Sequence, residues 1–238
     1  MQNQAAAHAR VRTFAVRTLY FFVVLTSFIA QAQTIQPLLS EYRNQANGTV
    51  QLTNDTFLPT NVVLEAKSFT VTEDGDLVYR PLDLDIEVKF AAKSFRIQPK
   101  QTYTVNYSAK AKTLPAYFVI YAAFSGKGLQ TDSGLNVNVL LPHTVYILPK
   151  NDAAKRELQV LASFDRDAGK VRLRVDSESD AFGRVLLTEV VGDKKKIEDA
   201  GFPVYPHKSR KFEVDWKEDS PPRKLVLHFR NFKLESPL

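Results

Sequence analysis

Apolar and polar residues alternate one by one along several short stretches, and this pattern constrains the fold more than any other feature. The stretches 84–90 and 135–141 both alternate in this way. A period of two is typical of a β-strand with one buried and one exposed face. No stretch of useful length repeats with the 3.6-residue period of a helix, and the 16 Phe and nine Tyr residues favour strands. The sequence therefore predicts an all-β protein.

The predicted strands fall into two groups. About seven follow one another up to Pro149, with turn signals between them, and the pattern restarts after the short linker 149–152. This spacing predicts two immunoglobulin-like β-sandwich domains in tandem, at residues 33–149 and 150–238. In the first domain, Tyr117–Phe124 is apolar nearly throughout, which predicts a central strand buried on both faces. A change of apolar face near Lys67–Ser68 predicts a bulge or a break there.

The first 32 residues differ from the rest. They carry three arginines and no acidic residue, then the apolar run Leu19–Ile29, then Ala30-Gln31-Ala32. This order predicts a secretory signal peptide at residues 1–32, cleaved before Gln33. The alternative is a membrane anchor, but the run is shorter than the roughly 20 residues that a spanning helix needs.

Composition argues against several classes of function. The chain has no cysteine, so it has no disulfide and no thiolate zinc site. Its four histidines lack the spacing of a metal pair, and it has neither a Gly-x-Ser-x-Gly elbow nor a glycine-rich phosphate loop. We therefore expect no enzyme, no metal and no cofactor. Without the leader arginines the formal charge falls from +6 to +3 and no basic face is visible, so we expect no nucleic-acid partner. The run Lys194–Lys196 is interpreted as a solvated hairpin tip.

The order of these pieces resembles the periplasmic chaperones of chaperone–usher pilus assembly. The segment Lys93–Val105 resembles a turn and the following strand of that family, with Lys100 where the family usually has Gly. Tyr117–Tyr121 resembles the next strand, and Leu135–Pro149 the long last strand of the first domain. Val171–Val175 and Gly201–Pro206 match the second domain more loosely.

The resemblance implies a function and two groups of site residues. Chaperones of this family lend a strand to pilus subunits that lack one, which is donor-strand complementation. Counting back from Pro149 places the groove-filling positions on Leu135, Val137 and Val139, with Leu141 continuing the row. The alternative is that this strand is an ordinary internal strand that packs only on its own sheet.

The second group is a pair of basic residues that hold the carboxylate at the C-terminus of the subunit. Arg43 is the candidate arginine, because it is the only basic residue between the leader and Lys67. The position of the lysine holds Thr144, with His143 beside it, so the chain is a divergent member by this resemblance. The resemblance also implies a periplasmic location, and pilin or fimbrial subunits and an outer-membrane usher as partners. The alternative function is a two-domain surface or adhesion protein without chaperone activity.

Overall fold

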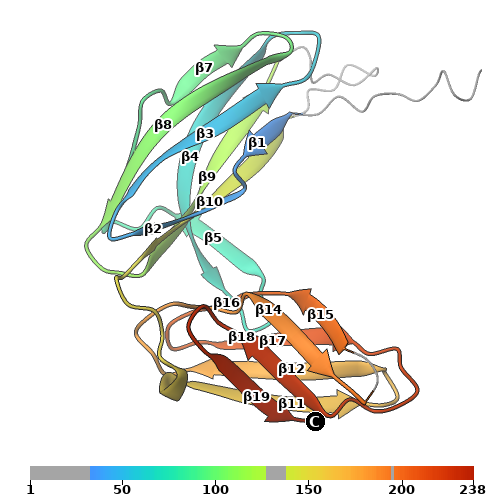
Figure 1. Cartoon of the computed structure of the whole chain (residues 1–238). Helices are drawn as coiled ribbons and strands as arrows, with labels where there is room; N and C mark the ends of the chain where they lie inside the picture. The colour runs from blue at the N-terminus through green and yellow to red at the C-terminus, as the bar shows by residue number, and fades with distance from the viewer. Residues whose placement is uncertain (1–32, 127–137, 194–195) are drawn as a thin grey trace, which may run out of the picture. The chain divides into compact units, whose positions relative to one another are not determined.

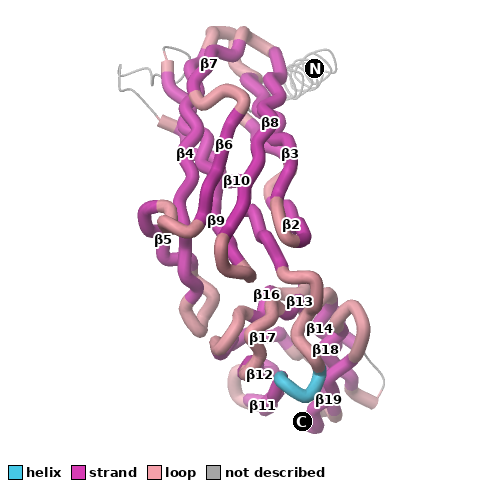
Figure 2. Tube along the Cα trace, turned by 90° about the vertical axis from the view of Figure 1, so that its left-hand side faces the viewer, coloured by secondary structure: helices cyan, strands magenta, loops and turns pink. Residues whose placement is uncertain are grey.

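The computed structural model describes residues 33–126, 138–193 and 196–238, which form one compact unit. Its regular elements are β-strands apart from one short 3-10 helix, η2 (Lys155–Glu157), which is cyan in Figure 2. This confirms the predicted all-β fold class. No helix among the described residues is long and apolar enough to cross a membrane. The predicted signal peptide and the lysines at 194 and 195 lie outside the described residues.

Two facing sheets form the first sandwich (Figure 1). The first sheet has the order β1-β3-β8-β6, and the second has the order β2-β10-β9-β4-β5, with β7 also paired to β4. The strands are β1 (Thr34–Gln36), β2 (Leu39–Arg43), β3 (Ala46–Asn54), β4 (Thr60–Val71), β5 (Leu77–Pro81), β6 (Ile86–Phe90), β7 (Ser94–Ile97), β8 (Gln101–Ala111), β9 (Ala116–Ser125) and β10 (Val139–Leu148). In Figure 2 the strands β3, β8 and β6 of the first sheet lie side by side.

The core of this sandwich follows from the alternation in the sequence. Val50 and Leu52 of β3 and Val62 and Leu64 of β4 are fully buried between the sheets. β9 lies between β10 and β4, and both faces of its middle part are covered, as predicted for a central strand. Burying each such side chain is worth roughly 1.5–3 kcal/mol, so this row of contacts is a main source of stability.

The second sandwich contains the strands after residue 157. They are β11 (Leu158–Asp165), β12 (Lys170–Ser177), β13 (Gly183–Arg184), β14 (Leu187–Val191), β15 (Lys196–Ala200), β16 (Pro203–Val204), β17 (Ser209–Asp215), β18 (Lys224–His228) and β19 (Lys233–Pro237). One sheet has the order β11-β12-β17, another has the order β15-β14-β18-β19, and β13 pairs with β16. Trp216 and Leu225 lie in a separate apolar core between them. The two predicted sandwiches are therefore present.

The expected bulge or break near Lys67–Ser68 is absent, because β4 runs unbroken through these residues. The change of apolar face is real and has another cause. Phe69 lies on the side of β4 away from the first core, where it is fully buried against Tyr146, Phe182 and Tyr205. The change of apolar face in the sequence therefore reflects a second apolar cluster and not an irregularity of the strand.

The turn between β7 and β8 explains the residue at position 100. Lys100 has a φ angle of 58°, the left-handed conformation that glycine adopts without strain. Its ammonium group donates to the carboxylate of Asp55 at 2.7 Å and lies 4.7 Å from the centre of the Phe57 ring. The position therefore keeps a glycine-type backbone, and the lysine side chain adds contacts to the neighbouring loop.

We predict that Lys100→Val lowers the free energy of unfolding by about 1–2 kcal/mol relative to Lys100→Gly, because a β-branched residue is disfavoured in this conformation. Both variants lose the same ion pair, so their difference reports the backbone alone. Urea unfolding of the two purified variants measures it. Equal stabilities would contradict the left-handed turn.

Candidate functional site

Strand β10 is paired along nearly its whole length on one side only. There, Val139–Ile147 lie antiparallel to β9. On the other side β2 runs parallel to Thr144–Leu148 alone (Figure 1). Among the described residues, no strand pairs with the remaining part, residues 139–143, on this second side. We call residues 139–143 the open edge.

The open edge exists because the first part of the chain changes sheets. β1 pairs with β3 in the first sheet, and after Pro37 the chain crosses to the second sheet as β2. Pro37 has no N–H group and has a fixed φ angle, so it suits the point where strand pairing stops. The crossing thus covers the end of β10 near Leu148 and leaves its beginning uncovered.

The main-chain groups of the open edge can be assigned from the neighbouring pairing. The Thr144 N–H donates to the Leu38 carbonyl at 2.8 Å, so the even-numbered residues of β10 turn their main-chain groups to this side. Leu140 therefore presents both its N–H and its carbonyl. Pro142 presents only a carbonyl, because proline has no N–H. An edge of this kind can accept another strand, and a proline partly blunts it.

Burial of the inner face of β10 decreases toward the open edge. Val145 and Ile147 are fully buried in the first core, whereas Leu141 and Val139 are half-buried and pack against its margin. The predicted row of Leu141 and Val139 therefore exists on one face. Leu135 and Val137, which would continue it, lie outside the described residues. The donor role of all four stays a prediction.

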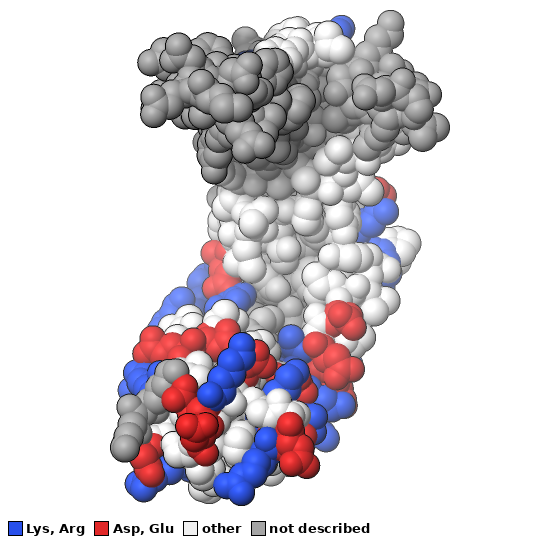
Figure 3. All heavy atoms as spheres, turned by 90° about the vertical axis from the view of Figure 1, so that its right-hand side faces the viewer, with Lys and Arg blue, Asp and Glu red and all other residues white. Residues whose placement is uncertain are grey.

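The outer face of the second sheet is apolar beside the open edge. Leu140, Ala123 and Val63 lie next to one another across three strands, and Leu140 and Val63 are 60% and 45% exposed. Leu39, which pairs with Thr144, is 42% exposed. In the view of Figure 3 the middle of the first sandwich is nearly free of charged side chains, whereas the second sandwich carries many of both signs. Exposed apolar areas of this kind are typical of surfaces that bind proteins.

Arg43, the predicted anchor for a carboxylate, already holds one. It ends β2, and its guanidinium donates to the Pro149 carbonyl and to the Asp152 carboxylate, each at 2.6 Å. The two side chains are 35% and 30% exposed, so the pair lies within reach of solvent. The geometry fits carboxylate binding, and Asp152 stands where an outside carboxylate would have to bind.

The other two anchor candidates differ from Arg43. His143 is fully buried, and both nitrogens of its ring are hydrogen-bonded inside the sandwich. Thr144 is half-buried and uncharged, and its N–H belongs to the pairing with β2. An outside carboxylate could reach the His143 ring only if the ring left the core. The anchoring roles of His143 and Thr144 remain predictions without support from their surroundings.

The partners of His143 could not be predicted from the sequence. Its Nε2 atom lies 2.8 Å from the Tyr107 hydroxyl, and its Nδ1 atom lies 2.7 Å from the Pro37 carbonyl. The Tyr107 hydroxyl is 3.1 Å from that of Tyr42. Pro37 and Tyr107 are distant from His143 in the sequence, and no local pattern connects them. Burial lowers the pKa of His143, and the Pro37 carbonyl opposes this effect.

Two further histidines each pair with one carboxylate. His207 lies 2.7 Å from Asp180, and His228 lies 2.8 Å from Glu189. In the part of the chain that the structure describes, no group of three or more His, Asp or Glu side chains could hold a metal ion. These pairs are consistent with ordinary polar contacts.

No family model matches the sequence, and no curated protein matches it. Solved structures match the fold. The class 5 fimbriae chaperone CfaA has a TM-score of 0.53 at 11% identity, covering 87% of this chain and 98% of its own. The YadV chaperone has 0.53 at 12% identity, covering 87% and 99%, and the Escherichia coli chaperone DraB has 0.51 at 13%, covering 87% and 96%. A structure of the Salmonella enterica SafA pilin in complex with the SafB chaperone matches with 0.51 at 12%, covering 87% and 96%.

These matches extend over both sandwiches. The chain therefore has the two-domain fold of the fimbrial chaperones, as the resemblance in its sequence implied. Identities of 11–13% establish the fold and leave the activity to be argued from the residues.

We predict that Tyr107→Phe lowers the free energy of unfolding by about 1–3 kcal/mol, because it leaves the Nε2 atom of His143 without its buried partner. Tyr103→Phe on the same strand is the control, since Tyr103 is 40% exposed. It should change stability by less than about 0.5 kcal/mol. Urea unfolding of both variants at pH 7.5 measures the two effects, and equal losses would contradict the buried hydrogen-bond chain.

Proposed function

We propose that this protein is a periplasmic chaperone that binds and stabilises pilus subunits by donor-strand complementation and delivers them for fibre assembly. The observation that carries the proposal is the open edge of β10, residues 139–143, in a chain with the fold of fimbrial chaperones. We infer no enzymatic step and no cofactor for this function.

Main-chain pairing supports the proposal first. A subunit that lacks one strand needs a strand from outside to complete its own sheet. The open edge offers the Leu140 N–H and the carbonyls of Leu140 and Pro142 to such a partner. β9 holds the opposite side of Val139–Ile147, so residues 139–143 are already extended before a subunit arrives. This lowers the entropy cost of binding.

The half-buried row of Val139 and Leu141 on the inner face of β10, here called the inner row, is the second support for the proposal. Val139 and Leu141 are half-buried, so they have apolar surface left to cover. Leu135 and Val137 precede them at the same period. Covering each of these side chains in a groove of the subunit would contribute roughly 1.5–3 kcal/mol before ordering costs.

Arg43 supplies a candidate anchor for the C-terminal carboxylate of the subunit. In the free protein its guanidinium is bound to Asp152. We propose that the subunit carboxylate takes the place of the Asp152 carboxylate, an exchange between two similar charged hydrogen bonds. The partial exposure of both side chains leaves a path for this exchange.

Delivery requires a second partner, and we propose an outer-membrane usher. The apolar outer face around Val63 and Leu140 is exposed, so it is a candidate surface for such a contact, and it is separate from the inner row. A cleaved leader at residues 1–32 would bring the chain to the periplasm. The alternative, a two-domain surface or adhesion protein, would bind no subunit through β10.

We predict that Leu140→Pro abolishes co-purification with a secreted immunoglobulin-like subunit encoded beside this gene, because it removes the main-chain donor of the open edge. Leu140→Ala is the matched control: it keeps the N–H and loses only a side chain on the outer face, so it should still bind. Co-expression and affinity purification of the pair measure both.

A third variant tests the inner row. Val139→Asp should also abolish binding while the free protein still unfolds cooperatively, because Val139 lies at the margin of the core. If all three variants bind like the unchanged protein, β10 is not the lent strand. If Val139→Asp fails to fold, Val139 belongs to the core of the chain itself, as in an ordinary internal strand.

We predict that Arg43→Ala weakens subunit binding by about tenfold or more, since hydrogen bonds to charged groups contribute about 1.5–3 kcal/mol. Asp152→Asn should leave binding equal or tighter, because it weakens the internal competitor. The stability of the free protein should change by less than about 1 kcal/mol in both, because the pair is partly exposed. Titration calorimetry measures the affinities, and unchanged binding by Arg43→Ala would exclude this anchor.

A further inference from the structure

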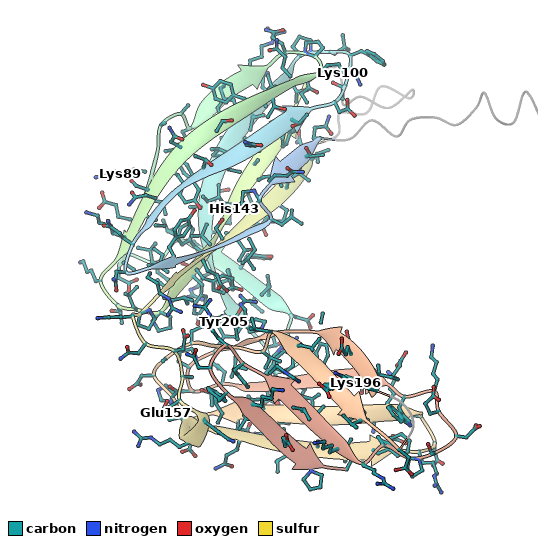
Figure 4. All side chains as sticks on the ribbon, in the orientation of Figure 1. Lys89, Lys100, His143, Glu157, Lys196 and Tyr205 are labelled. Atoms are coloured by element: carbon teal, nitrogen blue, oxygen red, sulfur yellow. The ribbon has the colours of Figure 1, made fainter. Side chains whose placement is uncertain are left out.

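His143 connects the open edge to the crossing of the first strand. Its ring is fully buried inside the first sandwich, where Figure 4 labels it, and it bonds the Pro37 carbonyl at one end. The next carbonyl, that of Leu38, accepts from the Thr144 N–H. Two consecutive residues of β10 thus hold two consecutive residues of the crossing. They do so at the point where pairing with β2 begins and the open edge ends.

The hydrogen bonds fix the proton of the neutral ring. A carbonyl can only accept, so the Nδ1 atom of His143 carries the proton and donates to Pro37. The Nε2 atom then accepts from the Tyr107 hydroxyl, whose oxygen is left to accept from Tyr42. With the neutral ring, each of the three donors in this row of hydrogen bonds has an acceptor.

The backbone of β3 is shaped for this arrangement. Gly48 pairs with Tyr107, and a Cβ atom at position 48 would lie 2.0 Å from the Tyr42 hydroxyl oxygen and 2.9 Å from that of Tyr107. Only glycine lets the two tyrosines meet beneath the histidine. Four strands and the crossing therefore contribute to one polar cluster within an apolar core.

The cluster has no charge to balance a protonated ring. Tyr107 of β8 and Tyr42 of β2 are its titratable members, and burial raises the pKa of Tyr107 further above its ordinary value. Ile120 of β9 lies opposite His143, and Gly48 is the β3 residue beneath the tyrosines.

The nearest charged residues of β2 face elsewhere. Glu41 and Arg43 alternate with Tyr42 and pair with Arg184 and Asp152 on the other side of the sheet. A proton on His143 would therefore add an uncompensated charge to a buried site, and the ring would be better solvated outside the core.

We propose that His143 is a proton-sensitive positioning residue: its neutral ring holds the Pro37–Leu38 crossing against β10, and its protonation releases the crossing and extends the open edge toward Thr144. What this release does for a subunit rests on the proposed function, whereas the release itself is a property of the free protein.

The sign of the pH dependence follows from proton linkage. The buried ring has a lowered pKa, and the released ring has the ordinary value of about 6.5. The closed form therefore binds fewer protons than the released form. The contact of His143 with the Pro37–Leu38 crossing is fully effective above about pH 6.5. It weakens as the pH falls below that value, by up to about tenfold in the opening equilibrium per pH unit.

Amide hydrogen exchange of Thr144 in the purified protein tests this, because its N–H makes the bond to Leu38 that the release breaks. After correction for the intrinsic rate, opening should increase up to about tenfold per unit between about pH 6.5 and 5. The amide of Val63, in the ladder between β4 and β9, should change much less. In His143→Gln, which cannot titrate, the pH dependence should vanish, and in His207→Gln it should remain.

A second measurement covers the case in which His143→Gln does not fold. The ring proton signals of His143 in the unchanged protein should titrate below about pH 6.5 and together with Thr144 opening. Titration at or above that value, or a Thr144 profile that stays flat in the unchanged protein, would overturn the proposal. If the profile is as expected but no subunit binds, the proton-linked release of the crossing is supported and the proposed function fails.

Discussion

The hydrogen bonds between β10 and the crossing after Pro37 determine the rest of the candidate site. His143 bonds the Pro37 carbonyl and Thr144 bonds the Leu38 carbonyl, so β2 begins pairing at one defined residue of β10. Had the first strand stayed in one sheet, β10 would be paired either fully or not at all on this side. The crossing instead gives β10 an anchored half, which is part of the core, and a half with a free edge. A strand can be lent to another protein only if its own fold does not need all of it.

Under the proposed function, the same row of side chains serves two demands. Near Leu148 the inner face is fully buried and stabilises the chain itself, whereas Val139 and Leu141 are only half covered. Burial of apolar surface does not distinguish a groove in the same chain from one in a partner. The gradient along β10 is therefore a physical account of how one strand can belong to a stable domain and still bind. The proposed role of Arg43 is similar, because its internal partner Asp152 would balance its charge until another carboxylate binds.

The sequence predicted the strands well because alternation is local. The two sandwiches and the row of Val139 and Leu141 follow from a period of two, and the central strand at Tyr117–Phe124 follows from its nearly unbroken apolar run. The sequence failed to predict the features that depend on contacts between residues far apart in the chain. The change of apolar face at Phe69 predicted a bulge or a break, because Phe182 and Tyr205 of the same apolar cluster lie more than a hundred residues away. The free edge of β10 depends on where β2 begins, and the burial of His143 depends on Pro37 and Tyr107, none of which any nearby pattern indicates.

The central claim is that β10 completes a sheet of another protein through its free edge. Amide hydrogen exchange of Leu140, compared between the free protein and its complex with a subunit, tests it most directly. The Leu140 N–H has no strand partner among the described residues, so it should exchange rapidly in the free protein. In the complex it should become protected by at least about a hundredfold, as expected for a hydrogen bond within a stable sheet. Rapid exchange of Leu140 in a tight complex would contradict the account.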